Sequence, residues 1–149
     1  MSLDILKHTK GRLLGVDFGE ARTGIAVSDA TRFLASGVCN VRGGALEKTA
    51  DAIVEKAREL GAVGLVIGLP RNMDGSEGER ARRVRGLAAA IESAAPDLAV
   101  AFFDERLSTV TASKYLNATD TRGQKRKAVI DTLSAEIILQ NALDRLRLP

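Results

Sequence analysis

The chain has 149 residues, 45% of them hydrophobic and 28% charged, which fits one globular domain with a full core and excludes a disordered chain. With one cysteine, Cys39, and one histidine, His8, it excludes an intramolecular disulfide, a cysteine-rich zinc site and a histidine-rich metal site. The formal charge is +3, and no apolar run approaches the roughly 20 residues that a membrane-spanning helix needs. We therefore expect a single cytoplasmic domain over residues 1–149, without a membrane partner, whose chemistry depends on carboxylates, hydroxyls, Lys or Arg.

The first half of the chain is predicted to form a mobile lead-in over residues 1–11, then three strands and a helix. Apolar runs and alternations separated by turn residues predict strands at 12–18, 23–28 and 34–41. Short turns between them indicate hairpins. A stripe of apolar residues at helical spacing predicts a helix over 45–60, and Gly61 ends it.

The second half alternates between strands and helices. The continuous apolar run 63–69 predicts a central strand covered on both faces. Ser76 followed by Glu79 is a capping box, which predicts a helix from there to about Ala95. A fifth strand is expected at 98–103, a short helix at 108–117, a polar and basic segment at 118–126, and a final helix at 127–147. This order predicts an α/β fold with a five-stranded mixed sheet, helices on both faces, and strands one, four and five as neighbours.

A carboxylate lies inside the apolar segment Gly15–Ala26, GVDFGEARTGIA. An ionised Asp17 in a buried strand costs several kcal/mol unless a cation or hydrogen-bond donors compensate it. Taken alone, Asp17 fits a metal or phosphate role as well as it fits an Asp that accepts hydrogen bonds from the turn amides of Gly19 and Glu20. The other acids decide between these interpretations.

Two further acids occupy informative positions. Asp104 and Glu105 directly follow the fifth strand, at the sheet edge where open α/β sheets place their sites. Asp131 interrupts the apolar stripe of the final helix, although alone it also fits a favourable charge in the first helical turn. Asp17, Glu105 and Asp131 together suit Mg²⁺ or Mn²⁺, which prefer oxygen ligands. Two such ions can hold both the attacking water and the leaving oxygen of a phosphodiester.

Positive charge is concentrated in two clusters that suit a phosphate backbone. They comprise Arg80, Arg82, Arg83 and Arg85, and then Arg122, Lys125, Arg126 and Lys127. The alternatives are a solvated helix face for the first cluster and a solubilising loop for the second. We expect 119–127 to be mobile and to close over nucleic acid.

The loop that follows the strand 63–69 is a further candidate contact. Its Asp-Gly turn presents free amides where a phosphate could bind, with Arg71 and Asn72 placed to help. The alternative is a turn that only shapes the sheet edge. The residues that we expect to contact nucleic acid are Arg22, Arg71, Asn72, Arg106, Arg122, Lys125, Arg126 and Lys127. Since aromatic residues make up only 3% of the chain, recognition is expected to rest on backbone and shape, which favours structured RNA or branched DNA.

Four segments of the chain resemble the signatures of the YqgF family, also called RuvX. They read GVDFGEARTGIAVSD, GLPRNMDGSEGERA, DERLST and DTLSAEIILQNALD. The resemblance implies an RNase H-like fold akin to the RuvC resolvases and a bacterial nuclease, described either as a Holliday junction resolvase or as the enzyme that matures the 5′ end of pre-16S rRNA. It places the family's catalytic acids on Asp17, Glu105 and Asp131, with Asp104 able to share or replace the role of Glu105.

Other functions stay in view at this point. A phosphotransferase or ATPase of the actin and hexokinase group also begins with a glycine-rich hairpin, but such proteins need two domains of this kind. A nucleic-acid-binding module without catalysis would not need all three acids. The sequence leaves open whether the substrate is RNA or DNA, and whether the protein is a monomer or a homodimer.

Overall fold

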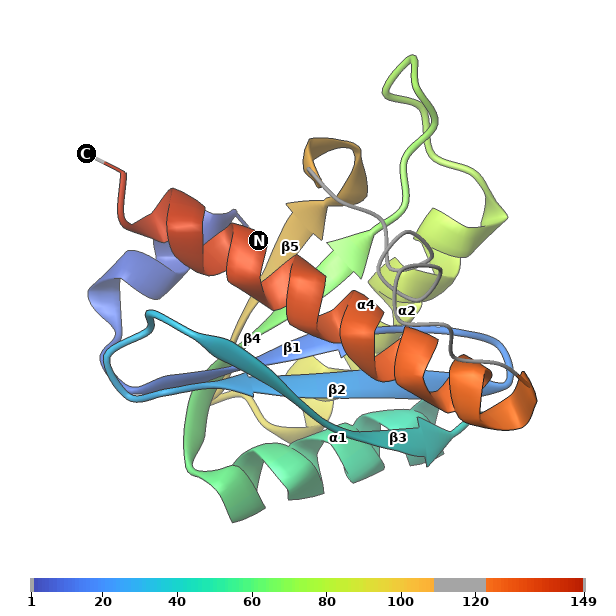
Figure 1. The fold of residues 1–149 in the computed structure, drawn as a ribbon, viewed down its shortest axis with the longest axis horizontal. Coiled ribbons are helices and arrows are strands. Elements are labelled where there is room, and N and C mark those ends of the chain that lie inside the picture. Colours follow the sequence, from blue (N-terminus) through green and yellow to red (C-terminus); the bar gives the residue numbers. More distant parts are fainter. Residues whose placement is uncertain (1, 109–122, 149) are drawn as a thin grey trace.

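A computed structural model of the protein describes residues 2–108 and 123–148, except for the side chains of 123–131. Its five strands are β1 (Arg12–Asp17), β2 (Arg22–Ser28), β3 (Ala35–Arg42), β4 (Ala62–Leu69) and β5 (Ala99–Asp104). The helices are α1 (Leu46–Leu60), α2 (Glu79–Ala94) and α4 (Gly123–Leu146), with short 3-10 helices η1 (Leu3–His8) and η2 (Glu105–Leu107). Helices α1 and α2 lie on one face of the sheet and α4 crosses the other (Figure 1).

The strand order is β3-β2-β1-β4-β5, which confirms the predicted mixed sheet. Strand β1 is central, antiparallel to β2 and parallel to β4, while β4 is parallel to β5. Strands one, four and five are therefore neighbours, as the sequence predicts. The parallel strands end at a common edge, where Asp17 and Asp104 are the last residues of β1 and β5.

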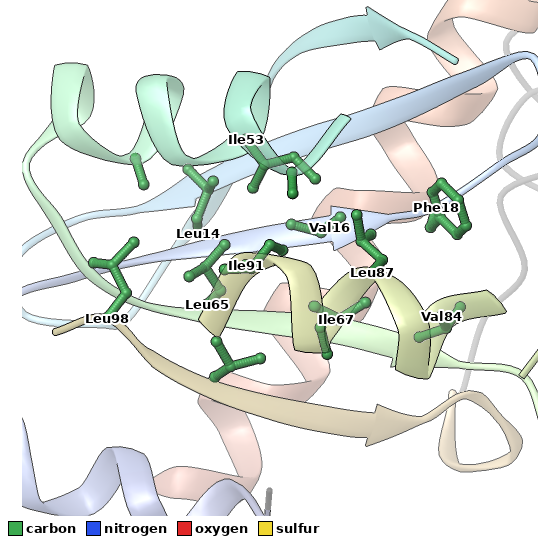
Figure 2. Packing of buried hydrophobic residues seen from close by; sticks show 14 of the residues in the cluster. Leu14, Val16, Phe18, Ile53, Leu65, Ile67, Val84, Leu87, Ile91 and Leu98 are labelled. Carbon is green, nitrogen blue, oxygen red and sulfur yellow. The ribbon is translucent and has the colours of Figure 1, made fainter. Parts of the chain in front are cut away.

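The core has two parts, one on each face of the sheet. Alternate residues of β1 and β4, such as Leu14, Val16 and Ile67, pack against α1 and α2 (Figure 2). The intervening residues, such as Leu13 and Val66, pack against the apolar residues of α4. The sheet is thus covered on both faces, which explains why β4 reads as a continuous apolar run.

The N-terminal segment is better ordered than the sequence predicts. Residues 3–8 form η1, and Leu6 is fully buried against the α4 face of the sheet. Arg32 donates hydrogen bonds to the carbonyl oxygens of Leu6 (2.9 Å) and Gly11 (2.6 Å). The prediction of a mobile lead-in was therefore wrong, because an arginine more than 20 positions later ties the segment to the domain.

Two predicted helix starts differ from the structure. Helix α2 begins at Glu79 after Gly78, because the Ser76 hydroxyl donates to Asp74 (2.6 Å) and forms no capping box. Helix α4 begins at Gly123, so the part of the predicted loop from there to 126 is helical. The predicted helix 108–117 falls almost wholly in 109–122, which lie outside the described residues. In the described part of the chain, no helix is both long and apolar enough to cross a membrane.

Candidate active site

Asp17 and Glu105 lie on the face of the sheet that α4 covers. In β1, a Cβ built on Gly15 would lie 2.6 Å from Leu139 Cβ, so this residue faces α4 closely. Side chains alternate along a strand, and Asp17 is two residues further on, so it faces α4 as well. Its cross-strand neighbour in β2 is Gly24, which has no side chain to cover the carboxylate.

Glu105 reaches the same face from the end of β5. A Cβ built on Gly68 of β4 would lie 3.3 Å from the Glu105 carboxyl carbon and 2.6 Å from Ile138 Cδ1. The Glu105 side chain therefore lies over Gly68, beside α4. Since Val16 of β1 pairs with Ile67 of β4, Gly68 is next to Asp17 across the two parallel strands. The residues beside Asp17 on the two neighbouring strands, Gly24 and Gly68, therefore place no side chain of their own next to it.

The environment of Glu105 disfavours its charged form. Burial raises the pKa of the Glu105 carboxyl, and the negative charge of Asp104 adds to the increase, while the positive charge of Arg80 opposes it. A half-buried carboxylate with a raised pKa gains most from a nearby cation. This is the electrostatic setting expected of a ligand to a divalent metal ion.

Asp104 has a different role in the structure. Its carboxylate accepts hydrogen bonds from the backbone amide of Arg106 (3.0 Å) and from Arg106 Nη2 (2.6 Å), and Arg71 Nη1 lies 4.0 Å away. These contacts lower the pKa of Asp104, with the hydrogen bond from the Arg106 side chain as the largest cause. Asp104 thus holds the η2 turn, and Glu105 is the acid at the end of β5 that turns toward α4.

The third predicted acid, Asp131, is on α4 one helical turn before Ala135, the residue whose carbonyl oxygen approaches Gly15. Its side chain lies outside the described residues. Among the side chains that are described, no three His, Cys, Asp or Glu residues come together as a metal site. A metal site with three carboxylates would need one from α4 in addition to Asp17 and Glu105.

Two polar residues near this site were missed by the sequence analysis. The Thr132 hydroxyl on α4 donates to Asn40 Oδ1 of β3 at 3.3 Å. Asn40 pairs with Gly24, which in turn pairs with Asp17, so the three residues form a row across β3, β2 and β1. The contact joins the middle part of α4 to β3. An asparagine in an edge strand carries no sequence signal for such a contact.

The loop between β4 and α2 projects beyond the sheet edge (Figure 1) and is held by its own charges. Arg71 Nη2 lies 3.4 Å from Glu77 Oε2, and Glu77 also accepts two hydrogen bonds from Arg85 (2.6 and 2.7 Å). Asn72 Nδ2 donates to Ser76 Oγ at 2.9 Å. Arg71 and Asn72 therefore contribute to the shape of this loop, and their contact with nucleic acid stays a prediction.

The other residues predicted to contact nucleic acid come from separate parts of the fold. Arg22 begins β2 opposite Arg42 of β3. Arg106 is bound to Asp104 and donates to the Met73 carbonyl oxygen (3.4 Å). Residue Arg122 and the side chains of Lys125, Arg126 and Lys127 lie outside the described residues, as do residues 119–122 of the segment expected to close over nucleic acid.

A comparison with known protein families agrees with the four sequence segments that resemble the RuvX signatures. Residues 11–145 match the RuvX family, described as Holliday junction resolvase. The chain belongs to the RuvX family. Two RuvX relatives share the name "Putative pre-16S rRNA nuclease". The one from Paracoccus denitrificans (strain Pd 1222) is 46% identical, over 92% of this chain and 86% of that protein. The one from Ruegeria pomeroyi is 44% identical, over 91% of this chain and 87% of that protein.

A solved structure shares the fold of this RuvX chain. The RuvC protein of T. thermophilus, determined in complex with a Holliday junction substrate, matches with a TM-score of 0.56 over 86% of this chain and 91% of that one. At 14% identity the match concerns the fold alone. It confirms the RuvC-like, RNase H-like architecture that the motifs implied.

Proposed function

We propose that this RuvX protein is a divalent-metal-dependent nuclease that hydrolyses phosphodiesters in structured nucleic acid, with 5′-end maturation of pre-16S rRNA as its task. The observation that supports the proposal is the register of β1 and β4, which brings Asp17 next to Gly68, the residue over which the Glu105 side chain lies. The names of the relatives support the choice of pre-16S rRNA.

The residues of the site fit a hard divalent cation such as Mg²⁺ or Mn²⁺. Asp17 and Glu105 offer carboxylate oxygens from two neighbouring strand ends, and Asp131 would supply a third from α4. Bound there, two ions would supply an activated water and stabilisation of the leaving oxygen. The chain itself holds the two strand-end acids in place, because Gly68 lets Glu105 lie beside Asp17 and the Arg106–Asp104 contact fixes the turn that carries Glu105.

A Holliday junction resolvase is the second candidate. The description of the matching family favours it, and so does the RuvC fold. Resolution of a symmetric junction needs two sites that act together, and therefore a homodimer. The maturation of one RNA end needs a single site, which a monomer can provide.

Depletion of the protein in its own cells tests the assignment. Precursor 16S rRNA should accumulate, and a plasmid copy of the parent should remove it whereas Asp17→Asn should not. In vitro, the purified protein should cut precursor rRNA with Mg²⁺ or Mn²⁺ and not with EDTA. Cleavage of a four-way DNA junction alone would favour the resolvase, ATP hydrolysis alone a phosphotransferase, and binding without cleavage a non-catalytic module.

A further inference from the structure

A pocket lies directly beyond the candidate site, at the start of α2. It has a volume of about 210 Å³ and is lined by Phe18, Gly19, Glu20, Arg80 and Arg83. Phe18 follows Asp17 in the chain and faces the opposite side of the sheet, where it packs near Val84 of α2 (Figure 2). The pocket therefore borders the same sheet edge as the two acids, on the α2 side.

Arg83 is held in position by an aromatic ring. Its guanidinium lies 5.5 Å from the centroid of the Phe18 ring, and its Nη1 donates to Glu20 Oε1 at 3.3 Å. The Glu20 side chain is 87% exposed, so this ion pair is of the solvent-screened kind that contributes little stability. The ring fixes the arginine, whereas the glutamate is easily replaced by another anion.

Arg80 adds a second positive charge to the pocket. Among the described side chains, no acid lies within ion-pair distance of it, yet its charge is felt at the Glu105 carboxyl. The pocket and the acidic site are therefore electrostatically connected. An anion bound between Arg80 and Arg83 would lie at the sheet edge where β1 ends, on the α2 side of the acids.

The chemistry of the pocket favours a phosphate group over a nucleobase. Two guanidinium groups suit phosphate oxygens, which they bind through charge-assisted hydrogen bonds. The Phe18 ring is only 8% exposed and is covered by Arg83, so it offers no platform on which a base could stack. A volume of about 210 Å³ is also below the range of roughly 300–1,000 Å³ that is usual for sites that bury whole small molecules.

We propose that this pocket binds a backbone phosphate of the substrate strand next to the scissile phosphate, and that Glu20 occupies the place of that phosphate when nucleic acid is absent. The proposal rests on the proposed nuclease function. Phosphates follow one another at about 3.4 Å of helix axis along each strand. A strand that crosses Asp17 and Glu105 would therefore bring a neighbouring phosphate within reach of the long side chains of Arg80 and Arg83.

The test measures binding without cleavage, in EDTA, by the anisotropy of a fluorescein-labelled 20-base-pair RNA duplex with a 5′ extension. Arg83→Ala should weaken binding by about tenfold, the usual effect of a lost hydrogen bond to a charged group. The slope of log affinity against log salt should fall by about 0.9.

Arg82→Ala is the matched control, because Arg82 is the adjacent residue, pairs with Glu79 (3.4 Å) and does not line the pocket. It should change affinity by about twofold or less, as expected for one general surface charge.

Glu20→Gln should change RNA affinity in the opposite direction to Arg83→Ala. Because Glu20 is on an exposed turn, this variant tests the proposal without disturbing the fold. Removal of the competing carboxylate should tighten binding of the same RNA, and the gain should disappear in the Glu20→Gln, Arg83→Ala double variant. Equal losses in Arg83→Ala and Arg82→Ala, or unchanged affinity in Glu20→Gln, would overturn the proposal. A protein that shows these differences but never cleaves RNA would refute the nuclease and retain the phosphate pocket.

Discussion

The two faces of the sheet are built differently. Toward α1 and α2 the strands present a continuous apolar layer that includes Leu14, Val16 and Ile67. Toward α4 the apolar contacts cover the stretch from Ala135 to Leu143, and the strand ends beyond it present glycines and acids. One face is therefore a continuous apolar layer, whereas the other combines close helix packing with glycines and acids at the strand ends. The comparison teaches that glycines in the strands of one sheet allow a helix and acidic side chains to lie close to one face while the other face stays fully apolar.

The largest expected effect comes from removing Asp17, the acid at the end of β1 on the α4 face. Asp17→Asn should reduce phosphodiester cleavage by on the order of 100-fold or more, the usual range for loss of a group that acts directly in the reaction. Initial rates with saturating Mn²⁺ on precursor rRNA provide the measurement. Unchanged turnover would remove the proposed site.

The two acids at the end of β5 should separate activity from stability. Glu105→Gln should lose activity as severely as Asp17→Asn while the protein stays folded. Asp104→Asn should retain most of its activity but lose about 1–2 kcal/mol of unfolding free energy, since its hydrogen bonds from Arg106 involve charged groups. Urea denaturation and cleavage rates of both variants test this pair. Equal loss of activity in the two variants would indicate that Asp104 also acts in the reaction.

Alanine at matched glycines should distinguish how tightly the helices pack on the two faces. In Gly15→Ala the new Cβ would lie 2.9 Å from the Ala135 carbonyl oxygen, so α4 must shift, at a cost of about 1–3 kcal/mol. In Gly86→Ala on α2 the nearest atom is the end of the flexible Leu46 side chain, at 3.2 Å. Higher helix propensity should then raise stability by up to about 1 kcal/mol. Thermal unfolding of both variants is the measurement, and a destabilised Gly86→Ala would show that both helices pack equally closely.

The smallest effect is on the pH dependence of stability, where the neighbouring acids should have opposite signs. The pKa of Glu105 is raised from its ordinary value of 4.5, so burying this carboxyl does not lower the free energy of unfolding at a pH well below 4.5. Stability is lost as the pH rises from 4.5 through the folded-state pKa. The lowered pKa of Asp104 contributes stability above its ordinary value of 3.8, which is lost as the pH falls through the folded-state pKa.

Denaturation of the variants between pH 3 and pH 7 measures both contributions. Relative to the parent, Glu105→Gln should become more stable as the pH rises above about 4.5. Asp104→Asn should become less stable than the parent as the pH rises toward about 3.8, and the full difference should remain at higher pH. Parallel profiles for the two variants would contradict the opposite environments of these acids.

The candidate acids at the strand ends could be named from the sequence because their signals are local. Asp17 interrupts an apolar run, and Glu105 follows directly on a strand, so each is visible within a few residues of its own position. The acids also face one edge because parallel strands must end together. Arg71 was harder to interpret, because its partners Glu77 and Asp104 come from the far end of its loop and from β5.

The sequence by itself determined the strand order and the central place of β1, since hydrophobic period and short turns restrict how such strands can pair. It also supplied the RuvX signatures that contain the acids. Only the tertiary structure decided which acid at the end of β5 turns toward α4. Alternation separates Asp104 from Glu105, but which face each occupies depends on the burial of Phe103 in the core on the α4 side of the sheet. The pocket at Arg80 and Arg83 likewise exists only because the fold brings the start of α2 to the turn after β1, more than 60 residues away in the chain.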